Sequence, residues 1–218
     1  MKRRQLLHAI CIAMTGASLP AIARAASRQR VAVVGVGGAG ANLAMALRLS
    51  GELAGAGVAI TYLCVDTDDR TVQRVRVAKA GTQYLPALQS LLLDRKQAST
   101  GKVLPERLSR LVDMTDTVVL LAGLGGTTGS TYTRLIAHAA ARQGVETVAA
   151  VVLPFSYEGQ RVEQASAVLA ELKTSARRII VSPNDALTER YGDELPLAEA
   201  FDRQERDLAE AIRRVIYR

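Results

Sequence analysis

Two glycine-rich segments are the parts of this sequence best suited to bind phosphate. The first covers residues 35–42 and reads GVGGAGAN, and the second covers residues 123–130 and reads GLGGTTGS. Glycine lets the backbone turn tightly and place its N–H groups against phosphate oxygens, and a helix that begins at such a loop adds its positive N-terminal end. We therefore expect both segments to hold a phosphorylated ligand, and we expect a side chain at Gly40 or Gly129 to fill the space of a phosphate.

The first segment taken alone favours a different ligand from the two segments together. It matches G-x-G-x-x-G, and Asp66 ends the next predicted strand, where dinucleotide-binding domains place an acid on a ribose. That pattern is typical of an NAD(P) site. Two glycine loops, however, suit a triphosphate held from both sides, and Thr127, Thr128 and Ser130 add hydroxyls for phosphate oxygens or a metal-bound water. A third alternative is a nucleotide-free scaffold whose glycines serve only packing and which binds a protein partner.

The elements that must position these segments follow from residue 30 onward. Runs of Val, Ile and Leu without polar alternation are typical of parallel strands covered on both faces. The predicted strands cover residues 31–34, 58–65, 117–122, 147–153 and 179–181, and the predicted helices cover residues 41–49, 106–112, 131–142 and 162–172. This order predicts an α/β fold, a doubly wound, mostly parallel, Rossmann-like sheet with helices on both faces, whose ligands bind at the carboxyl ends of the strands.

Two further segments carry weaker local patterns. Residues 98–102 read ASTGK and are expected to form an exposed loop. Near the end of the chain, Phe201, Leu208, Ile212 and Val215 recur at helical spacing, with charged residues between them. This pattern predicts a helix with one apolar face toward the core and one charged face toward water.

The order of these motifs resembles the N-terminal GTP-binding domain of the tubulin/FtsZ family, and FtsZ in particular. The first glycine loop ends in Gly-Asn, as it does in that family. The other matching segments are residues 66–68 (DTD, where the family has Asn-Thr-Asp), residues 125–131 (the signature glycine loop), residues 154–159 (PFSYEG), residues 183–185 (PND) and residues 200–201 (AF, which opens the central helix). The resemblance covers residues 29–217.

The resemblance implies a role for each matching residue and a guanine nucleotide, GTP or GDP, as the ligand, with Mg²⁺ held through the phosphates. Glu158 would accept hydrogen bonds from the ribose hydroxyls, Arg161 would lie near the sugar and phosphates, and Glu205 would stand at the base. The α- and β-phosphates would lie on Gly37, Gly38, Ala39, Gly40, Ala41 and Asn42, and the β- and γ-phosphates on Gly125, Gly126, Thr127, Thr128, Gly129 and Ser130. Association with itself or with an FtsZ-like subunit is also implied.

The sequence departs from the family pattern within these motifs. Thr127 and Thr131 stand where the family prefers glycine, and a β-branched residue tolerates a positive φ poorly, so we expect a reshaped loop. Val162 replaces a basic residue that usually follows Arg161. Glu205 and Arg206 replace an Asn-Asp pair that reads the base. A carboxylate at residue 205 can still accept from guanine, whereas an arginine cannot accept a hydrogen bond at all.

The chain ends at Arg218, inside the predicted last helix. In the family this helix leads to a second domain, whose loop carries an acidic residue that completes hydrolysis in the neighbouring subunit. We therefore expect a chain without that catalytic acid, weakly hydrolytic or inactive as a GTPase by itself. The charged outer face of the last helix is what we expect of a domain adapted to standing alone.

Composition and the N-terminus bound the remaining possibilities. Lys2, Arg3, Arg4 and Arg24 supply four of the 28 basic residues, and the rest of the chain, at 24 basic against 21 acidic, is too weakly charged to predict nucleic-acid binding.

Residues 1–25 resemble a twin-arginine signal peptide, so we expect residues 29–218 to be the exported, periplasmic domain, or a cytoplasmic one if that segment is not a leader. No run of about 20 apolar residues predicts a membrane span, and Cys64 is expected to be a buried thiol.

Overall fold

The fold is described by a computed structural model of the chain. It describes residues 28–51, 53, 57–80, 88–100, 102–192 and 194–217. The predicted leader, residues 1–25, lies outside these residues. Among the described helices, none combines the length and the hydrophobicity needed to cross a bilayer.

The centre of the molecule is a parallel sheet of six strands in the order β3-β2-β1-β4-β5-β6. The strands are β1 (Gln29–Val36), β2 (Val58–Asp66), β3 (Leu88–Leu92), β4 (Thr117–Gly123), β5 (Glu146–Leu153) and β6 (Arg178–Pro183). Every pair of neighbours is parallel. The order reverses between β1 and β4, and such a switch point is where ligands bind in open α/β sheets. The predicted doubly wound sheet is confirmed.

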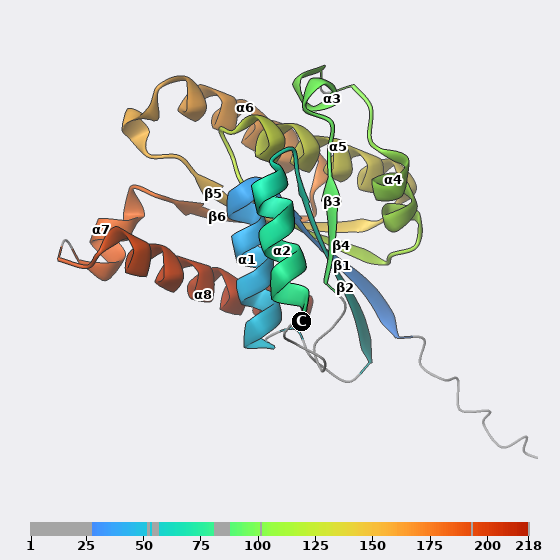
Figure 1. The fold of residues 1–218 in the computed structure, drawn as a ribbon, viewed down its shortest axis with the longest axis horizontal. Helices are drawn as coiled ribbons and strands as arrows, with labels where there is room; N and C mark the ends of the chain where they lie inside the picture. The colour runs from blue at the N-terminus through green and yellow to red at the C-terminus, as the bar shows by residue number, and fades with distance from the viewer. Residues whose placement is uncertain are drawn as a thin grey trace, which may run out of the picture.

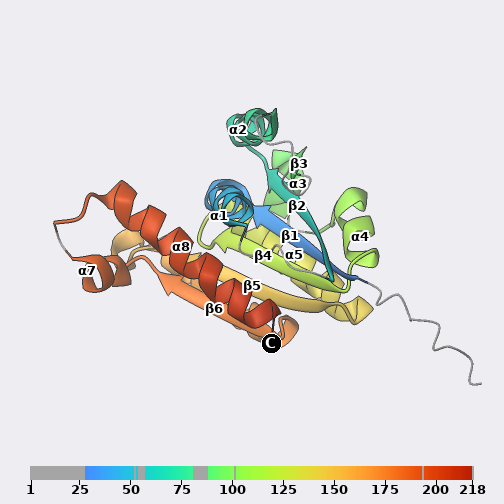
Figure 2. The ribbon, with the colours of Figure 1, turned by 90° about the horizontal axis from the view of Figure 1, so that it is seen from below.

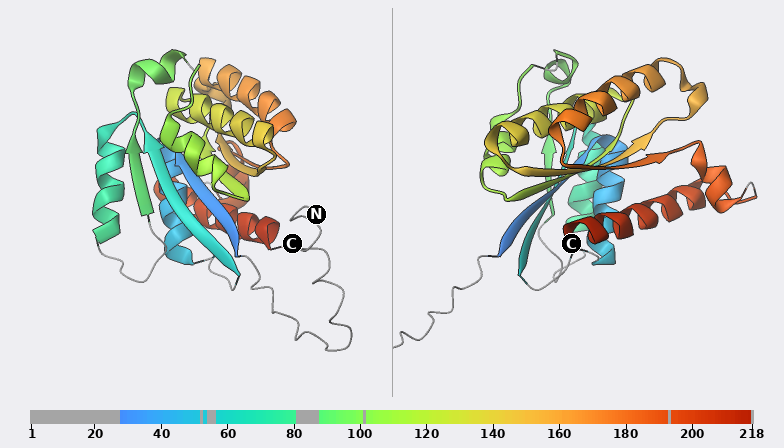
Figure 3. Two further views of the ribbon diagram at one scale, coloured as in Figure 1. Left: turned by 90° about the vertical axis from the view of Figure 1, so that its right-hand side faces the viewer. Right: turned by 180° about the vertical axis from the view of Figure 1, so that it is seen from behind.

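Helices cover both faces of this sheet (Figure 1). They are α1 (Gly37–Ser50), α2 (Asp69–Ala80), α3 (Arg95–Thr100), α4 (Glu106–Asp113), α5 (Thr127–Gln143), α6 (Gln160–Ser175), α7 (Ala186–Tyr191) and α8 (Leu197–Ile216), with a short 3₁₀ turn at Ser156–Glu158. Helix α8 runs along β5 and β6 (Figure 2). Helices α5 and α6 lie on the opposite side of the sheet from α8 (right view of Figure 3).

The hydrophobic core is divided by the sheet into two layers. Alternate residues of β1 face opposite ways: Val31 and Val33 pack toward α1 and α8, and Ala32 and Val34 pack toward α4, α5 and α6. Both layers are apolar, which explains why the strands read as continuous hydrophobic runs. Cys64 belongs to the α1 layer and is buried, as predicted, and burial raises the pKa of its thiol to about 12.

Helix α8 confirms the prediction of one apolar and one charged face. Leu208 and Ile212 are buried against the sheet. Every exposed residue from position 202 to position 214 is charged; these are Asp202, Arg203, Arg206, Asp207, Glu210, Arg213 and Arg214. Burying these charges beneath another body would cost solvation energy that only complementary partners could offset.

The segment between β2 and β4 differs from the prediction of an exposed loop at residues 98–102. Residues 98–100 form the end of α3, and Ala98 is buried in the core. Lys96 and Gln97 donate backbone N–H groups to the Asp94 carboxylate, which starts this short helix. The local sequence is polar, so only packing against α5 distinguishes the helix from a loop.

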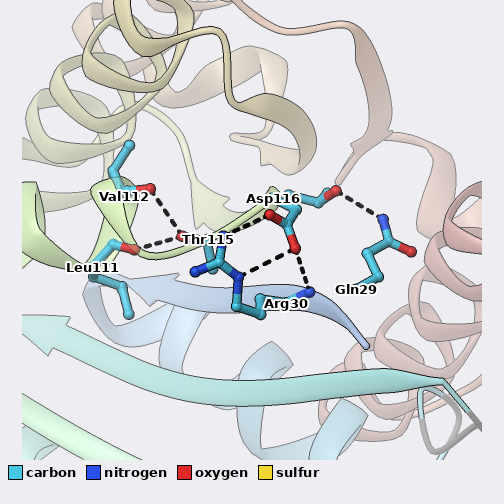
Figure 4. Close-up of polar contacts among 7 residues, drawn as sticks. Gln29, Arg30, Leu111, Val112, Thr115 and Asp116 are labelled. Atoms are coloured by element: carbon cyan, nitrogen blue, oxygen red, sulfur yellow. Dashed lines mark hydrogen bonds and ion pairs between the residues drawn. The ribbon is translucent and has the colours of Figure 1, made fainter. Parts of the chain in front are cut away.

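An ion pair ties the amino ends of the two central strands together (Figure 4). Arg30 donates its backbone N–H and its guanidinium to the Asp116 carboxylate, at 2.8 Å and 2.7 Å. These hydrogen bonds hold the pKa of Asp116 below its usual range. The pair therefore stabilises the fold above the ordinary carboxyl pKa and ceases to do so as the pH falls through the lowered value. Both side chains are exposed, so the contribution is small.

Glycines let the helices that follow β1 and β4 lie against the backbone of the sheet. A Cβ on Gly40 of α1 would lie 2.1 Å from the Leu121 carbonyl oxygen in β4, and a Cβ on Gly129 of α5 would lie 2.2 Å from the Gly123 carbonyl oxygen. Backbone atoms in the middle of a sheet cannot move away. These two glycines are therefore required for packing, and the expectation that their Cβ atoms would occupy phosphate space is wrong.

The packing role of Gly40 gives a stability prediction. We expect Gly40→Ala to lower the free energy of unfolding by about 2 to 3 kcal/mol, because the new methyl group overpacks the contact between α1 and β4. The matched control is Gly126→Ala, since a Cβ there meets nothing within 4 Å and the backbone φ of −97° suits any residue. The control should change stability by no more than about 1 kcal/mol. Urea denaturation of both variants, followed by circular dichroism, measures the difference, and equal losses would contradict the packing role.

Candidate functional site

A groove made of two adjoining cavities runs along the carboxyl edge of the sheet. The first cavity, of about 230 Å³, lies over the ends of β1 and β4, and we call it the glycine cup. The second, of about 310 Å³, extends toward β5 and α8, and we call it the side cavity. Ala39, Gly123 and Arg161 line both, so the two cavities adjoin. The groove lies at the switch point, where the fold class predicts a ligand.

Five of the eleven residues that line the glycine cup are glycines. The cup is formed by Val36, Gly37, Gly38, Ala39, Asp66, Gly123, Gly126, Thr127, Thr128, Gly129 and Arg161. Helices α1 and α5 both begin in it, at Gly37 and Thr127, and the N–H groups of a first helical turn have no partner within the helix. The two helix ends adjoin, because a Cβ on Gly37 would lie 3.4 Å from the backbone N of Gly129. Two sets of free N–H groups and two positive helix ends therefore meet in one cup.

The second glycine loop accommodates its threonines without strain. The left-handed conformation falls on Gly125, with φ of +90°, and no residue other than glycine has a positive φ in the described part of the chain. Thr127 occupies the first position of α5 and Thr131 its second turn. The Ser130 hydroxyl is buried and accepts the Gly125 N–H at 2.9 Å, so it holds the loop in shape. Thr127 and Thr131, which stand where the family prefers glycine, therefore fit the loop without a positive φ, and the loop stays open toward the cup.

Two glycines of the cup point toward empty space. A Cβ on Gly126 would meet nothing within 4 Å, and one on Gly38 would meet only the Thr71 hydroxyl, at 3.9 Å. These positions, and not Gly40 and Gly129, are where an added side chain would compete with a ligand. Of the remaining residues in the first loop, Ala41 is buried in the core and Asn42 lines the side cavity.

The side cavity combines an apolar wall with amide and carboxylate groups. Its apolar residues are Leu43, Leu124, Val152, Leu153, Pro154 and Phe201, and its polar residues are Asn42, Asn184, Gln204 and Glu205. A flat heterocycle needs such a combination, since its faces are apolar and its edge carries donors and acceptors. Three of these lining residues, Phe201, Asn184 and Gln204, were not among the predicted site residues, although Phe201 and Asn184 belong to matched motifs.

The polar end of the side cavity is fixed by hydrogen bonds. Gln204 is buried, and its side-chain amide donates to the Ser182 hydroxyl at 3.0 Å and to Asn184 Oδ1 at 3.5 Å. Glu205 is half-buried, and burial, with the nearby Asp202 charge, raises the pKa of its carboxyl. Arg206 is exposed and lies outside the cavity lining. Of the two substituted positions, only Glu205 therefore faces the groove.

Glu158, the predicted ribose contact, is not among the described residues that line the groove. Glu158 Oε1 accepts the Phe155 backbone N–H at 2.8 Å, and Oε2 pairs with the Arg161 guanidinium. Both carboxylate oxygens are thus engaged within the chain. Arg161 itself lines both cavities, and its place near the sugar and phosphates stays a prediction.

Asp66 lies on the side of the cup formed by the end of β2. Its Oδ1 accepts the backbone N–H groups of Thr67 and Asp68, at 2.7 Å and 3.3 Å. The Thr67 and Thr128 hydroxyls are hydrogen-bonded at 2.8 Å, which joins this loop to the start of α5. A carboxylate and hydroxyls beside free amide groups form a donor set that suits Mg²⁺ together with phosphate oxygens.

Comparison with known proteins agrees with this geometry. The family model described as "Tubulin/FtsZ family, GTPase domain" matches residues 30–192. The cell division protein FtsZ of Neisseria gonorrhoeae is 29% identical over 188 residues, which cover 84% of this chain and 46% of that protein. FtsZ 1 of Pyrococcus abyssi is 31% identical over 191 residues, which cover 85% of this chain and 50% of that protein. The chain spans about half the length of these relatives.

The fold is also similar to that of a solved FtsZ structure. The structure of the empty FtsZ dimer of M. jannaschii superposes with a TM-score of 0.68 at 24% identity, covering 98% of this chain and 58% of that one. The predicted family resemblance and fold class are confirmed. With the match to the family model covering well over half of its residues, the chain belongs to the tubulin/FtsZ family and contains the GTPase domain of that family.

Proposed function

We propose that the chain binds a guanine nucleotide along the groove, with the phosphates in the glycine cup and the base in the side cavity. The expected ligands are GTP and GDP, with Mg²⁺ held through the phosphates. The observation that carries this proposal is the meeting of two helix N-termini in one cup that adjoins an apolar cavity. The family membership of the domain supports it independently.

The apolar wall and Glu205 support guanine as the base. Phe201 offers a ring against which a purine could stack, and the Glu205 carboxylate can accept hydrogen bonds from guanine N1–H and N2–H. Adenine has no donor at its N1 position and would leave the carboxylate unpaired. Because Arg206 points away from the cavity, the absence of an acceptor at that position does not affect this assignment.

Self-association belongs to the same proposal. The FtsZ of M. jannaschii was solved as a dimer, and we propose that this chain also associates with like subunits. Nucleotide binding by the groove does not depend on this extension.

The binding proposal is tested by titrating the chain with GTP, ATP and NAD in the presence of Mg²⁺. We expect saturable binding of GTP, and we expect Gly126→Val to weaken it at least about 100-fold, because the isopropyl group fills the cup. Isothermal titration calorimetry measures both affinities. A thermal melt shows that the variant is folded, as the open space around Gly126 predicts. Saturable binding of NAD alone, or unchanged GTP affinity in the variant, would refute the proposal.

The base assignment is tested at Glu205. We expect Glu205→Gln to weaken GTP binding about 10- to 100-fold, because one acceptor oxygen becomes an N–H donor that faces the donors of guanine. The affinity for ATP should stay the same. Arg206→Gln, at the neighbouring exposed position, serves as the control and should alter neither affinity. If the ratio of GTP to ATP affinity is the same in all three proteins, Glu205 does not recognise the base.

Hydrolysis by the chain alone is expected to be slow. The two carboxylates lining the groove are Asp66, whose Oδ1 holds its own loop, and Glu205, which lies in the side cavity. Glu205 lies away from the cup, and the family resemblance assigns the orientation of the attacking water to an acid of a neighbouring subunit and not to position 66. We expect turnover of about 10⁻² s⁻¹ or slower, the range of GTPases without an added catalytic group. Release of phosphate from GTP and Mg²⁺ measures it, and a rate near that of ordinary enzymes would contradict the assignment.

A further inference from the structure

A third cavity lies beside strand β3, at the far end of the sheet from β6 and α8 (Figure 2). It has a volume of about 200 Å³ and is enclosed by α2, β3 and the start of α4. The described residues that line it are Val75, Arg76, Leu88, Gln89, Ser90 and Arg107. None of them lines the glycine cup or the side cavity, so this cavity is separate from the groove.

The polar side chains of this cavity can donate hydrogen bonds into it. Arg76 comes from α2 and Arg107 from α4, and a guanidinium has five N–H donors and no acceptor. Arg107 donates to Gln89 Oε1 at 2.8 Å, so the Gln89 amide keeps its two N–H donors for another partner. The Ser90 hydroxyl makes no hydrogen bond to any residue that the structure describes. Four neighbouring side chains therefore have donors to offer to one ligand.

The two arginines of the cavity are not neutralised by an acid. In the described part of the chain neither Arg76 nor Arg107 forms an ion pair, and the lining contains no carboxylate. Glu106, which precedes Arg107, pairs with Arg110 instead. Asp94 accepts backbone N–H groups at the start of α3. Two positive charges at one cavity repel each other, and an anion bound between them removes that repulsion.

The segment that forms this cavity is strongly basic. Residues 69–110 contain nine of the 24 basic residues that follow the predicted leader, but only three of the 21 acidic residues. The chain after the leader is nearly balanced in charge, so its positive charge is concentrated in this segment. Such a field attracts anions and raises their local concentration.

We propose that this cavity binds a phosphoryl group, as an anion site separate from the groove. A phosphoryl dianion matches the charge of two guanidinium groups, and its oxygens can accept from Arg76, Arg107 and Ser90 together. A carboxylate has a single charge and two oxygens, so it would leave donors unused. Val75 and Leu88 are buried and close the cavity on its inner side. The inference does not depend on the proposed nucleotide, because the two sites share no described lining residue.

The experiment titrates the full 218-residue chain with inorganic phosphate and, separately, with O-phosphoserine, and follows the backbone amide signals by ¹H–¹⁵N NMR. Gln89 and Ser90 report on this cavity, whereas Gly38 and Gly126 report on the glycine cup. We expect saturable shifts at Gln89 and Ser90 with a dissociation constant of about 1 mM, because both arginines are exposed to solvent. The tighter-binding probe shows whether the phosphoryl group is that of a free ion or of a phosphorylated side chain.

Variants of the two arginines test the assignment. We expect Arg76→Gln and Arg107→Gln each to weaken phosphate binding at this cavity at least about tenfold, because each change removes one charge and one donor fork. The matched control is Arg110→Gln, which removes the same charge from the same helix but lies outside the lining. The control should alter the dissociation constant by no more than about twofold. Spectra recorded without ligand verify that all three variants are folded.

Three results would overturn the inference. They are phosphate-induced shifts that are confined to the glycine cup or absent altogether, a loss of affinity in Arg110→Gln equal to that in Arg107→Gln, and the same shifts at Gln89 and Ser90 with sodium chloride at equal ionic strength. The signals of the glycine cup test the proposed function separately, so failure at one site leaves the other proposal standing.

Discussion

The groove depends on how closely two helices approach the backbone of strand β4. Gly40 lets α1 rest on the Leu121 carbonyl, and Gly129 lets α5 rest on the Gly123 carbonyl. Any larger residue would push the helix ends away from the strand ends and from each other. The convergence of two N-terminal turns, which forms the cup, follows from this contact between backbones and not from any side chain that touches a ligand.

The proposed nucleotide would be recognised in the two cavities through different physical interactions. The cup offers amide dipoles and helix ends, which favour phosphate without recognising anything else. The side cavity offers a ring, aliphatic side chains and a half-buried carboxylate, which can recognise the shape and the edge of a base. Arg161 lies between them, held by Glu158. Among the described residues that line the cup, Asp66 is the one carboxylate.

The charged face of α8 bears on how this domain meets other bodies. In this chain the outward side of the helix carries seven exposed charges between positions 202 and 214, some joined in pairs such as Arg214 with Glu210. A second domain or subunit that contacts α8 must therefore do so through a polar, complementary interface. The chain spans about half the length of these FtsZ relatives, and the match to the family model ends at residue 192, before α8 begins. The leader at residues 1–25 and the export it implies stay predictions.

The sequence by itself determined the parallel strands, the two glycine loops and the amphipathic last helix, because hydrophobic runs, glycine and helical spacing are local properties. Helical spacing also places Glu205 on the inward face of α8, because it lies four residues after Phe201 and three before Leu208. Only the tertiary structure decided that Gly40 and Gly129 serve packing while Gly38 and Gly126 open into the cup. These outcomes depend on β1 pairing with β4, a strand far along the chain, and no local pattern specifies which backbone atoms that pairing brings into contact.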